Sequence, residues 1–484
     1  MKLIIKRYLR ILALTLAAAT VATGLAGCGI ISLNRPGRTE NSSTAEDTTG
    51  DAGENFEVAV HNYSKYRTRF LKDVASADHG GGTVKFVGVG ADMIVPGDDT
   101  PAVLSEQLND RNASVEKRLN VSVAAETRDV ETLKSELAAA VKSGSYYADI
   151  IMIPQSYIGE FARDGLIMNL AGLPMFDAEK DYFTSPGAGG GNGVIYGIAG
   201  PASLELNCLS AVFFNKSIIE KTGLESPYKL VDRGEWTWDK FIEYANAAAE
   251  QEGVCGYTAQ NTAGYLADIA YYSCGQVFVS SDSGAMPSIA LESEEAAAAV
   301  SKIVSALNDT KSADGALTGI ETFKSGGAAF LFESLSSLSI LSDSAAEWGL
   351  LPLPKYSVEQ ENYVSLGNPQ EACFFAVPVT VTDVQKVSDT IRAVNIYSYG
   401  SIVDASVENA AGFYLRDNDS IRMLRTVANG AAYDLAYSYA NEARAIPSGT
   451  YMAVRNTVDE ISTVDKYVNM WRDLFDSAMQ NLFG

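Results

Sequence analysis

Apolar positions recur with two different periods along the central part of the chain. Residues 83–89 form a β-branched, apolar run that predicts a strand, and residues 149–153 form a run that suits a strand buried on both faces. Between them, Leu104, Leu108 and Val115 recur at helical spacing. Strands and helices therefore alternate, which is the order expected for an α/β fold with parallel sheets.

Capping residues mark where several helices begin. Asp129 precedes an apolar helical face and is expected to cap that helix, and Asn215 and Thr237 stand at two further helix starts. The last third of the chain is predicted to be helical and is rich in Tyr and Asp. Further strands are predicted at residues 121–126, 194–199, 209–214, 327–332, 348–353 and 372–377.

The first residues follow a different pattern. Basic residues precede an apolar run at residues 11–25, and small residues then lead to Cys28. This order is typical of a secretory signal peptide, because the run is shorter than the roughly 20 residues of a transmembrane helix. Leu25-Ala26-Gly27-Cys28 resembles the bacterial lipobox, and the resemblance implies acylation of Cys28 after removal of the signal peptide. A plain secretory signal with a chance cysteine is the alternative.

Composition changes again after Cys28. Residues 29–54 are rich in Ser, Thr, Asn, Asp, Glu and Gly, which predicts a flexible tether, and residues 56–78 are interpreted as an appended arm. The segment 29–82 is therefore expected to precede the folded body. A formal charge of -23 argues against nucleic acid and anionic lipid headgroups as partners.

The distribution of His and Cys excludes several chemistries. Both histidines, His61 and His79, precede the first predicted strand, so neither a Ser-His-Asp or Cys-His mechanism nor a His-rich metal site is expected. No cofactor and no metal are predicted. Four further cysteines lack C-x-x-C spacing and are interpreted as free thiols, with 255–274 as the one pairing worth testing. They are Cys208, Cys255, Cys274 and Cys373.

Three segments of the chain carry motifs whose order and spacing can be compared with known families. The segments are 148–151 continuing to Gly165-Leu166, 212–216 followed by 236–241, and 323–330 followed by 351–354. Together they resemble the extracellular solute-binding proteins of family 1, the maltose-binding-protein-like receptors of ABC importers. The resemblance spans roughly residues 83–393.

The resemblance implies a two-lobed, periplasmic-binding-protein-like fold of type II. Hinge strands would join parallel-sheet lobes around a ligand cleft, and the lobes would close on the ligand. Lobe 1 would hold residues 83–200 plus 348–392, and lobe 2 would hold residues 201–347 plus 393–484.

Candidate ligand-binding residues are polar or aromatic side chains at strand ends that face the presumed cleft. Sugar sites combine aromatic rings with side chains that hydrogen-bond hydroxyl groups. The maltose-binding members carry a Trp and an Asp-Arg pair where this chain has Ile153 and Ser156-Tyr157, so maltodextrin binding does not transfer. The candidates are Asp92, Gln155, Ser156, Tyr157, Glu205, Asn207, Thr262, Tyr265 and Glu333.

The function implied is that of a receptor rather than an enzyme. A monomeric, lipid-anchored protein on the extracytoplasmic face of the membrane would deliver a small solute, most simply a carbohydrate, to ABC permease subunits. Three alternatives stay open: a peptide or polyamine as solute, a glycoside hydrolase using Glu205 and Glu333, and a structural surface lipoprotein. The sequence names neither the ligand nor the permease.

Overall fold

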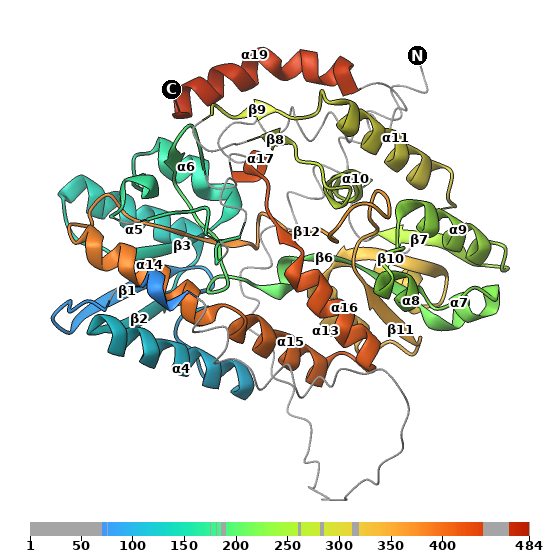
Figure 1. The fold of residues 1–484 in the computed structure, drawn as a ribbon, viewed down its shortest axis with the longest axis horizontal. Helices are drawn as coiled ribbons and strands as arrows, with labels where there is room; N and C mark the ends of the chain where they lie inside the picture. The colour runs from blue at the N-terminus through green and yellow to red at the C-terminus, as the bar shows by residue number, and fades with distance from the viewer. Residues whose placement is uncertain are drawn as a thin grey trace, which may run out of the picture.

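Two four-stranded sheets organise the described part of the chain. The computed structural model describes residues 70–74, 76–174, 176–180, 182–184, 190–259, 263–280, 285–311, 319–438 and 464–483. The sheets lie on opposite sides of the molecule, and each has helices packed against it (Figure 1). This is the two-lobed α/β architecture that the sequence predicted.

The first sheet has the strand order β13–β3–β1–β2. Its strands are β1 (Gly82–Gly88), β2 (Val121–Thr127), β3 (Ile150–Pro154) and β13 (Cys373–Ala376). Strand β1 is parallel to β2 and β3, whereas β13 is antiparallel to β3. Helices that pack on this sheet are α4 (Ala102–Leu119), α5 (Val130–Ser143) and α14 (Val384–Ser398).

Local chemistry explains where these elements begin and end. The Asp129 carboxylate accepts a hydrogen bond from the Thr132 amide at 2.9 Å, which caps α5 as predicted. Gly144 closes the same helix in a left-handed conformation, with φ of 67°. Every residue of β3 is buried, as its uninterrupted apolar run predicted.

The second sheet has the order β11–β6–β10–β7 and mixes parallel with antiparallel pairs. Its strands are β6 (Ser210–Asn215), β7 (Cys255–Ala259), β10 (Ala328–Ser334) and β11 (Trp348–Leu351). Trp238 and Phe332 stack in its core at a centroid distance of 5.6 Å. The helices of this lobe are α7 (Lys216–Thr222), α8 (Pro227–Asp232), α9 (Trp238–Ala249), α10 (Ala263–Ser273), α11 (Glu294–Asn308) and α12 (Gly319–Lys324).

Strand β11 corrects the predicted lobe boundaries. The sequence assigned residues 348–353 to lobe 1, but Trp348 pairs with Asn215 and Leu351 with Val212, so β11 belongs to the second sheet. An apolar run shows that a strand exists without showing which sheet it joins. Helix α14 continues to Ser398 and therefore runs across the predicted boundary at residues 392/393.

The first lobe also begins earlier than predicted. The ring of Phe70 packs edge-on against Tyr182 and Tyr399, with centroid distances of 5.3 and 5.1 Å. His79 Nε2 lies 3.2 Å from a carboxylate oxygen of Asp389 on α14. The residues before β1 therefore include part of the folded body, where the sequence predicted only an arm.

Elements near the C-terminus connect the two lobes (Figure 1). These are α15 (Ser401–Phe413), α16 (Asn418–Asn429), β14 (Ala431–Ala432) and α17 (Leu435–Ser438). Helix α15 packs on α4 of the first lobe and on α16, and α16 packs on β11 of the second. Strand β14 pairs in parallel with β12 (Ser365–Leu366). Helix α19 (Val464–Phe483) packs near β9 (Ser288–Ile289).

Short elements complete the described fold. The predicted strand at residues 194–199 shortens to β5 (Val194–Ile195), paired with β4 (Gly190–Gly191). In the described ranges, no helix combines the length and the apolar character needed to cross a bilayer. The other short elements are η1 (Leu71–Asp73), η2 (Ala91–Met93), η3 (Gln155–Tyr157), α6 (Ile158–Arg163), η4 (Leu170–Gly172), η6 (Leu206–Cys208), β8 (Val279–Ser280), η7 (Leu335–Ser337) and α13 (Leu338–Leu341).

Candidate functional site

The carboxyl ends of β1 and β3 lie at the same edge of the first sheet, because the two strands are parallel. Asp92 stands on η2, shortly after β1, and is exposed. Gln155 and Ser156 stand on η3, directly after β3, and both are fully buried. Open α/β sheets bind ligands at this edge. The structure therefore brings these three predicted site residues to one edge of one sheet.

Glu205 joins this edge from the segment that leaves the first lobe. Its Oε1 lies 3.5 Å from Cys373 Sγ at the start of β13. A Cβ atom at Gly90 would lie 2.6 Å from the same oxygen, so the carboxylate can approach the end of β1 only because that residue is glycine. Burial, followed by the charge of Asp92, raises the pKa of Glu205 to about 7.

Two further carboxylates extend this negative region toward the second sheet. Burial, followed by the charge of Glu333, raises the pKa of Glu371. Glu333 lies near the end of β10, is buried, and accepts a hydrogen bond from the Ser334 amide at 2.8 Å. We call Asp92, Glu205 and Glu371 the acidic group. Glu333 therefore influences the acidic group from the second lobe.

Gln155 contacts a segment that is remote in the sequence, and the two bonds span 279 and 283 residues. Its Nε2 donates to the Asp434 carbonyl oxygen at 2.7 Å and to Ser438 Oγ at 3.2 Å. The Gln155 Oε1 and Ser156 Oγ atoms are buried and have no hydrogen-bond partner among the described residues. A buried polar atom without a partner is costly, so both oxygens are candidates to contact a polar ligand.

The segment bonded to Gln155 also contacts the second lobe. We call residues 433–438 the interlobe segment, all of whose side chains are buried. The Tyr272 hydroxyl on α10 donates to the Tyr433 carbonyl oxygen at 3.0 Å. The Phe278 amide donates to Asp434 Oδ2 at 2.7 Å. The interlobe segment is therefore bonded to both lobes.

Asp434 is the buried acid at the centre of this arrangement. Burial raises the pKa of its carboxyl to about 7, although hydrogen bonds from the Ala436, Phe278 and Val279 amides act in the opposite direction. The charge of Asp268, on α10, raises the pKa further. Asp268 in turn accepts a hydrogen bond from the Tyr437 hydroxyl at 3.0 Å.

Three other predicted site residues lie apart from Gln155. The Tyr157 hydroxyl donates to Glu131 Oε1 on α5 at 3.2 Å, and its ring is half-buried. Asn207 is exposed on η6. Glu333 is held by the Ser334 amide as described above. Among the described residues, no side-chain hydrogen bond joins Tyr157 or Asn207 to Gln155, so their roles stay predictions.

The side chains of three residues singled out from the sequence are not among those described. Thr262 and Cys28 lie outside the described residues. Tyr265 belongs to α10, whose path is described, but its side chain is not. These three assignments also stay predictions.

The sequence interpretation missed the residues that link the lobes. Asp268 interrupts an otherwise apolar helix, and Asp434 stands between Tyr433 and Leu435. Their position among apolar residues could have identified them, because a carboxyl group that is buried needs hydrogen-bond partners. Tyr and Asp were noted as frequent in this region, but sequence spacing did not show that they meet.

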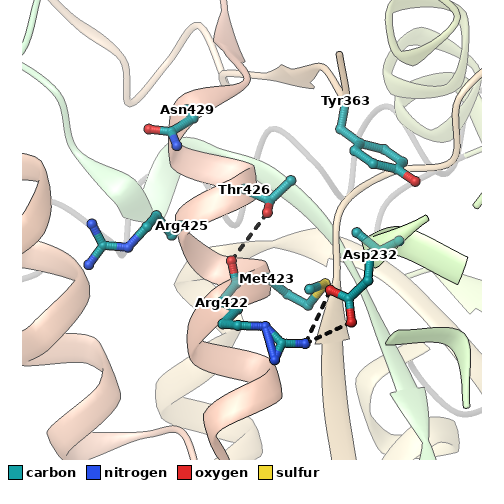
Figure 2. A pocket seen from close by; sticks show the side chains of 8 residues that line it. Asp232, Tyr363, Arg422, Met423, Arg425, Thr426 and Asn429 are labelled. Atoms are coloured by element: carbon teal, nitrogen blue, oxygen red, sulfur yellow. Dashed lines mark hydrogen bonds and ion pairs between the residues drawn. The ribbon is translucent and has the colours of Figure 1, made fainter. Parts of the chain in front are cut away.

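A surface pocket of about 340 Å³ lies beside α16, away from the residues predicted from sequence. Figure 2 shows Arg422 reaching toward Asp232, whose two carboxylate oxygens lie 3.0 and 3.1 Å from Arg422 Nη2. None of the predicted site residues lines this pocket. Its lining consists of Val231, Asp232, Tyr363, Arg422, Met423, Arg425, Thr426 and Asn429.

The described cysteines are neither paired nor grouped as metal ligands. Cys208, Cys255, Cys274 and Cys373 are all buried free thiols, as the sequence predicted, and 255 and 274 are not paired. Within the described ranges, no group of three or more His, Cys, Asp or Glu side chains has the geometry to hold a metal ion.

Comparison with known proteins places the chain among binding proteins. A sequence model of the family described as bacterial extracellular solute-binding protein matches residues 112–392, more than half of the chain. Among curated protein sequences, none matches.

Solved structures share the fold at low sequence identity. The cyclic alpha-maltosyl-1,6-maltose binding protein from Arthrobacter globiformis is 14% identical, with a TM-score of 0.53 over 82% of this chain and 99% of that chain. A cyclo/maltodextrin-binding protein complexed with maltotetraose is 13% identical, with a TM-score of 0.53 over 82% and 97%. A family 1 extracellular solute-binding protein from Bifidobacterium longum subsp. infantis is 14% identical, with a TM-score of 0.50 over 84% and 99%.

Proposed function

Because the chain belongs to the bacterial extracellular solute-binding protein family, we propose that it is the solute receptor of an ABC importer, with a sugar or oligosaccharide as its solute. The family match supports solute binding. Two proteins of similar structure support the carbohydrate assignment. One is a cyclic alpha-maltosyl-1,6-maltose binding protein, and the other is a cyclo/maltodextrin-binding protein complexed with maltotetraose. Delivery to permease subunits follows from the importer assignment.

One observation at the site carries the proposal. Gln155 Oε1 and Ser156 Oγ are buried and have no hydrogen-bond partner in the part of the chain that the structure describes. They lie at the carboxyl end of β3, the edge at which such sheets bind ligands. Two sugar hydroxyls can donate to these oxygens, one to each. Asp92, which is exposed at the same edge, can accept a further hydroxyl hydrogen bond that its carboxylate charge strengthens. Glu205 offers another acceptor oxygen beside it.

Attachment to the membrane is part of the same proposal. Acylation of Cys28 would anchor the mature chain on the extracytoplasmic face, and the polar residues 29–54 would tether the folded body. This arrangement keeps a receptor close to its permease while leaving the lobes free to move.

Binding can be tested by calorimetric titration of the mature chain with a panel of sugars and oligosaccharides. With a solute found in this way, Ser156→Ala is expected to weaken binding about threefold to tenfold, because one hydrogen bond to the solute is lost. The melting temperature without solute should change little, since Ser156 Oγ bonds to no described residue.

Ser388→Ala is the matched control for this experiment. Ser388 is also a buried serine of the first lobe, but its hydroxyl donates to the Pro174 carbonyl oxygen at 2.7 Å. The control should lower stability and leave affinity unchanged. Equal affinity of the Ser156→Ala variant and the parent would place the solute elsewhere, and steady release of sugar products would contradict a receptor.

A cationic solute such as a polyamine is the second candidate. The acidic group favours it, because Asp92, Glu205 and Glu371 present carboxylates near the same sheet edge. Adding spermidine and putrescine to the panel separates the two candidates. Binding of an amine that weakens steeply with ionic strength would favour the cationic solute.

A further inference from the structure

The interlobe segment, residues 433–438, has attachments on two sides. On the first-lobe side, Gln155 Nε2 bonds to both ends of the segment, at Asp434 and Ser438. The ring of Phe374, in β13, packs edge-on against Tyr433 at a centroid distance of 5.3 Å. These contacts fix the segment to the edge of the first sheet.

On the second-lobe side, the attachments are equally specific. Tyr272 donates to the Tyr433 carbonyl oxygen, and Tyr437 donates to Asp268. The ring of Phe278 packs edge-on against Tyr437 at 5.9 Å, and the Phe278 amide bonds to Asp434. Buried aromatic contacts therefore continue from β13 of the first sheet through the segment to the second lobe.

The segment is also seated tightly at its start. β14 precedes it and pairs with β12, so its path is set by a backbone ladder. A Cβ atom at Gly367 would lie 2.3 Å from the Tyr433 ring, which leaves no space between the ring and the backbone beside β12. The segment is therefore held at a defined place between the lobes.

We propose that the interlobe segment is a strap that holds the two lobes at their present separation and covers Gln155 until it is released. Lobe opening breaks the contacts on one side of the strap. Release also frees Gln155 Nε2 for a solute, and this second consequence rests on the proposed function. The strap itself is a property of the protein without solute.

Each end of the strap can be weakened separately. Gln155→Met keeps most of the side-chain volume and removes the two bonds of the first-lobe end. The double variant Tyr272→Phe/Tyr437→Phe keeps both rings and removes two hydroxyl bonds of the second-lobe end. Tyr147→Phe is the matched control, because its hydroxyl donates to Glu136 within the first lobe at 2.7 Å.

The measurement uses the mature chain without solute. Spin labels at Lys142→Cys on α5 and Lys221→Cys on α7, both exposed, report the distance between the lobes. Both strap variants are expected to add a longer-distance population. Amide exchange in residues 433–438 should become about tenfold to a hundredfold faster, because each variant loses two hydrogen bonds to the segment. The control should match the parent in both measurements.

The outcomes separate the strap from solute binding. Distance distributions of both variants that coincide with the control would overturn the strap, even if the parent binds a sugar. Longer distances in the variants would support the strap, even if no sugar binds. Circular dichroism checks folding, and if Gln155→Met does not fold, the tyrosine double variant decides the question by itself.

Discussion

At the scale of single residues, Glu205 has a carboxyl group whose pKa is strongly shifted by its surroundings. Glu205 is partly buried next to Cys373 and within the influence of Asp92. Burial and a like charge both disfavour its ionised form, so the folded state retains a proton that the unfolded chain releases. This difference links the stability of the fold to pH.

The sign of the effect follows from the direction of the shift. The pKa of Glu205 is raised from 4.5 to about 7, so its contribution to stability is fully present below pH 4.5 and is lost as pH rises toward 7. Glu205→Gln is therefore expected to match the parent at pH 4 and to exceed its free energy of unfolding at pH 8 by about 1–2 kcal/mol, a figure reduced for partial solvent exposure.

Urea unfolding at a series of pH values measures this effect. Glu220→Gln makes the same chemical change at an exposed position of α7 and is the control. A pH dependence that is the same in Glu205→Gln and the parent would show that Glu205 is ionised in the folded state.

At the scale of elements, capping residues explain where helices begin, and Asp417 also forms an ion pair with a second helix. Asp417 caps α16 by accepting from the Ser420 amide at 2.7 Å. Its other carboxylate oxygen lies 2.8 Å from Lys216 Nζ at the start of α7. One carboxylate therefore joins a helix near the C-terminus to the second lobe, whereas the cap of α5, Asp129, serves only its own helix.

Replacement of these two caps should have unequal effects. Asp129→Ala removes one exposed cap bond and is expected to lower the free energy of unfolding less than Asp417→Ala does. Asp417→Ala should cost about 1–2 kcal/mol, since it also removes the partly buried ion pair with Lys216. The free energies come from urea unfolding. Equal costs for the two variants would mean that the ion pair contributes nothing to stability.

At the scale of the whole molecule, the two lobes meet through buried polar groups rather than through an apolar interface alone. Asp434 bonds to the Phe278 amide, and Asp268 and Tyr272 of α10 lie close to it. Gln155 approaches the same residue from the first lobe. A charge at this place affects the contact between the lobes.

Lobe separation should therefore depend on pH. The pKa of Asp434 is raised from 3.8 to about 7, so its stabilising contribution is present below pH 3.8 and is lost as pH rises through about 7. The longer-distance population of the spin-labelled parent should increase between pH 6 and pH 8.5. Asp434→Asn should abolish this change, and a change that persists in the variant would assign it to another titratable group.

Much of this protein was determined by local sequence patterns. Apolar runs predicted β1 and β3, capping residues predicted the starts of α5 and α7, and strand–helix alternation predicted two α/β lobes. These predictions succeeded because burial and capping act over a few residues. The placement of Gln155 and Ser156 at a sheet edge followed from the same reasoning.

Only the tertiary structure decided how distant segments combine. Trp348 could have joined either sheet, because strand pairing depends on the path of the whole chain. The hydrogen bond between Gln155 and Asp434 joins residues that are 279 positions apart, and no sequence pattern around either residue predicts it. The pKa values of Glu205 and Asp434 likewise come from burial and from neighbours remote in sequence, which a local pattern does not contain.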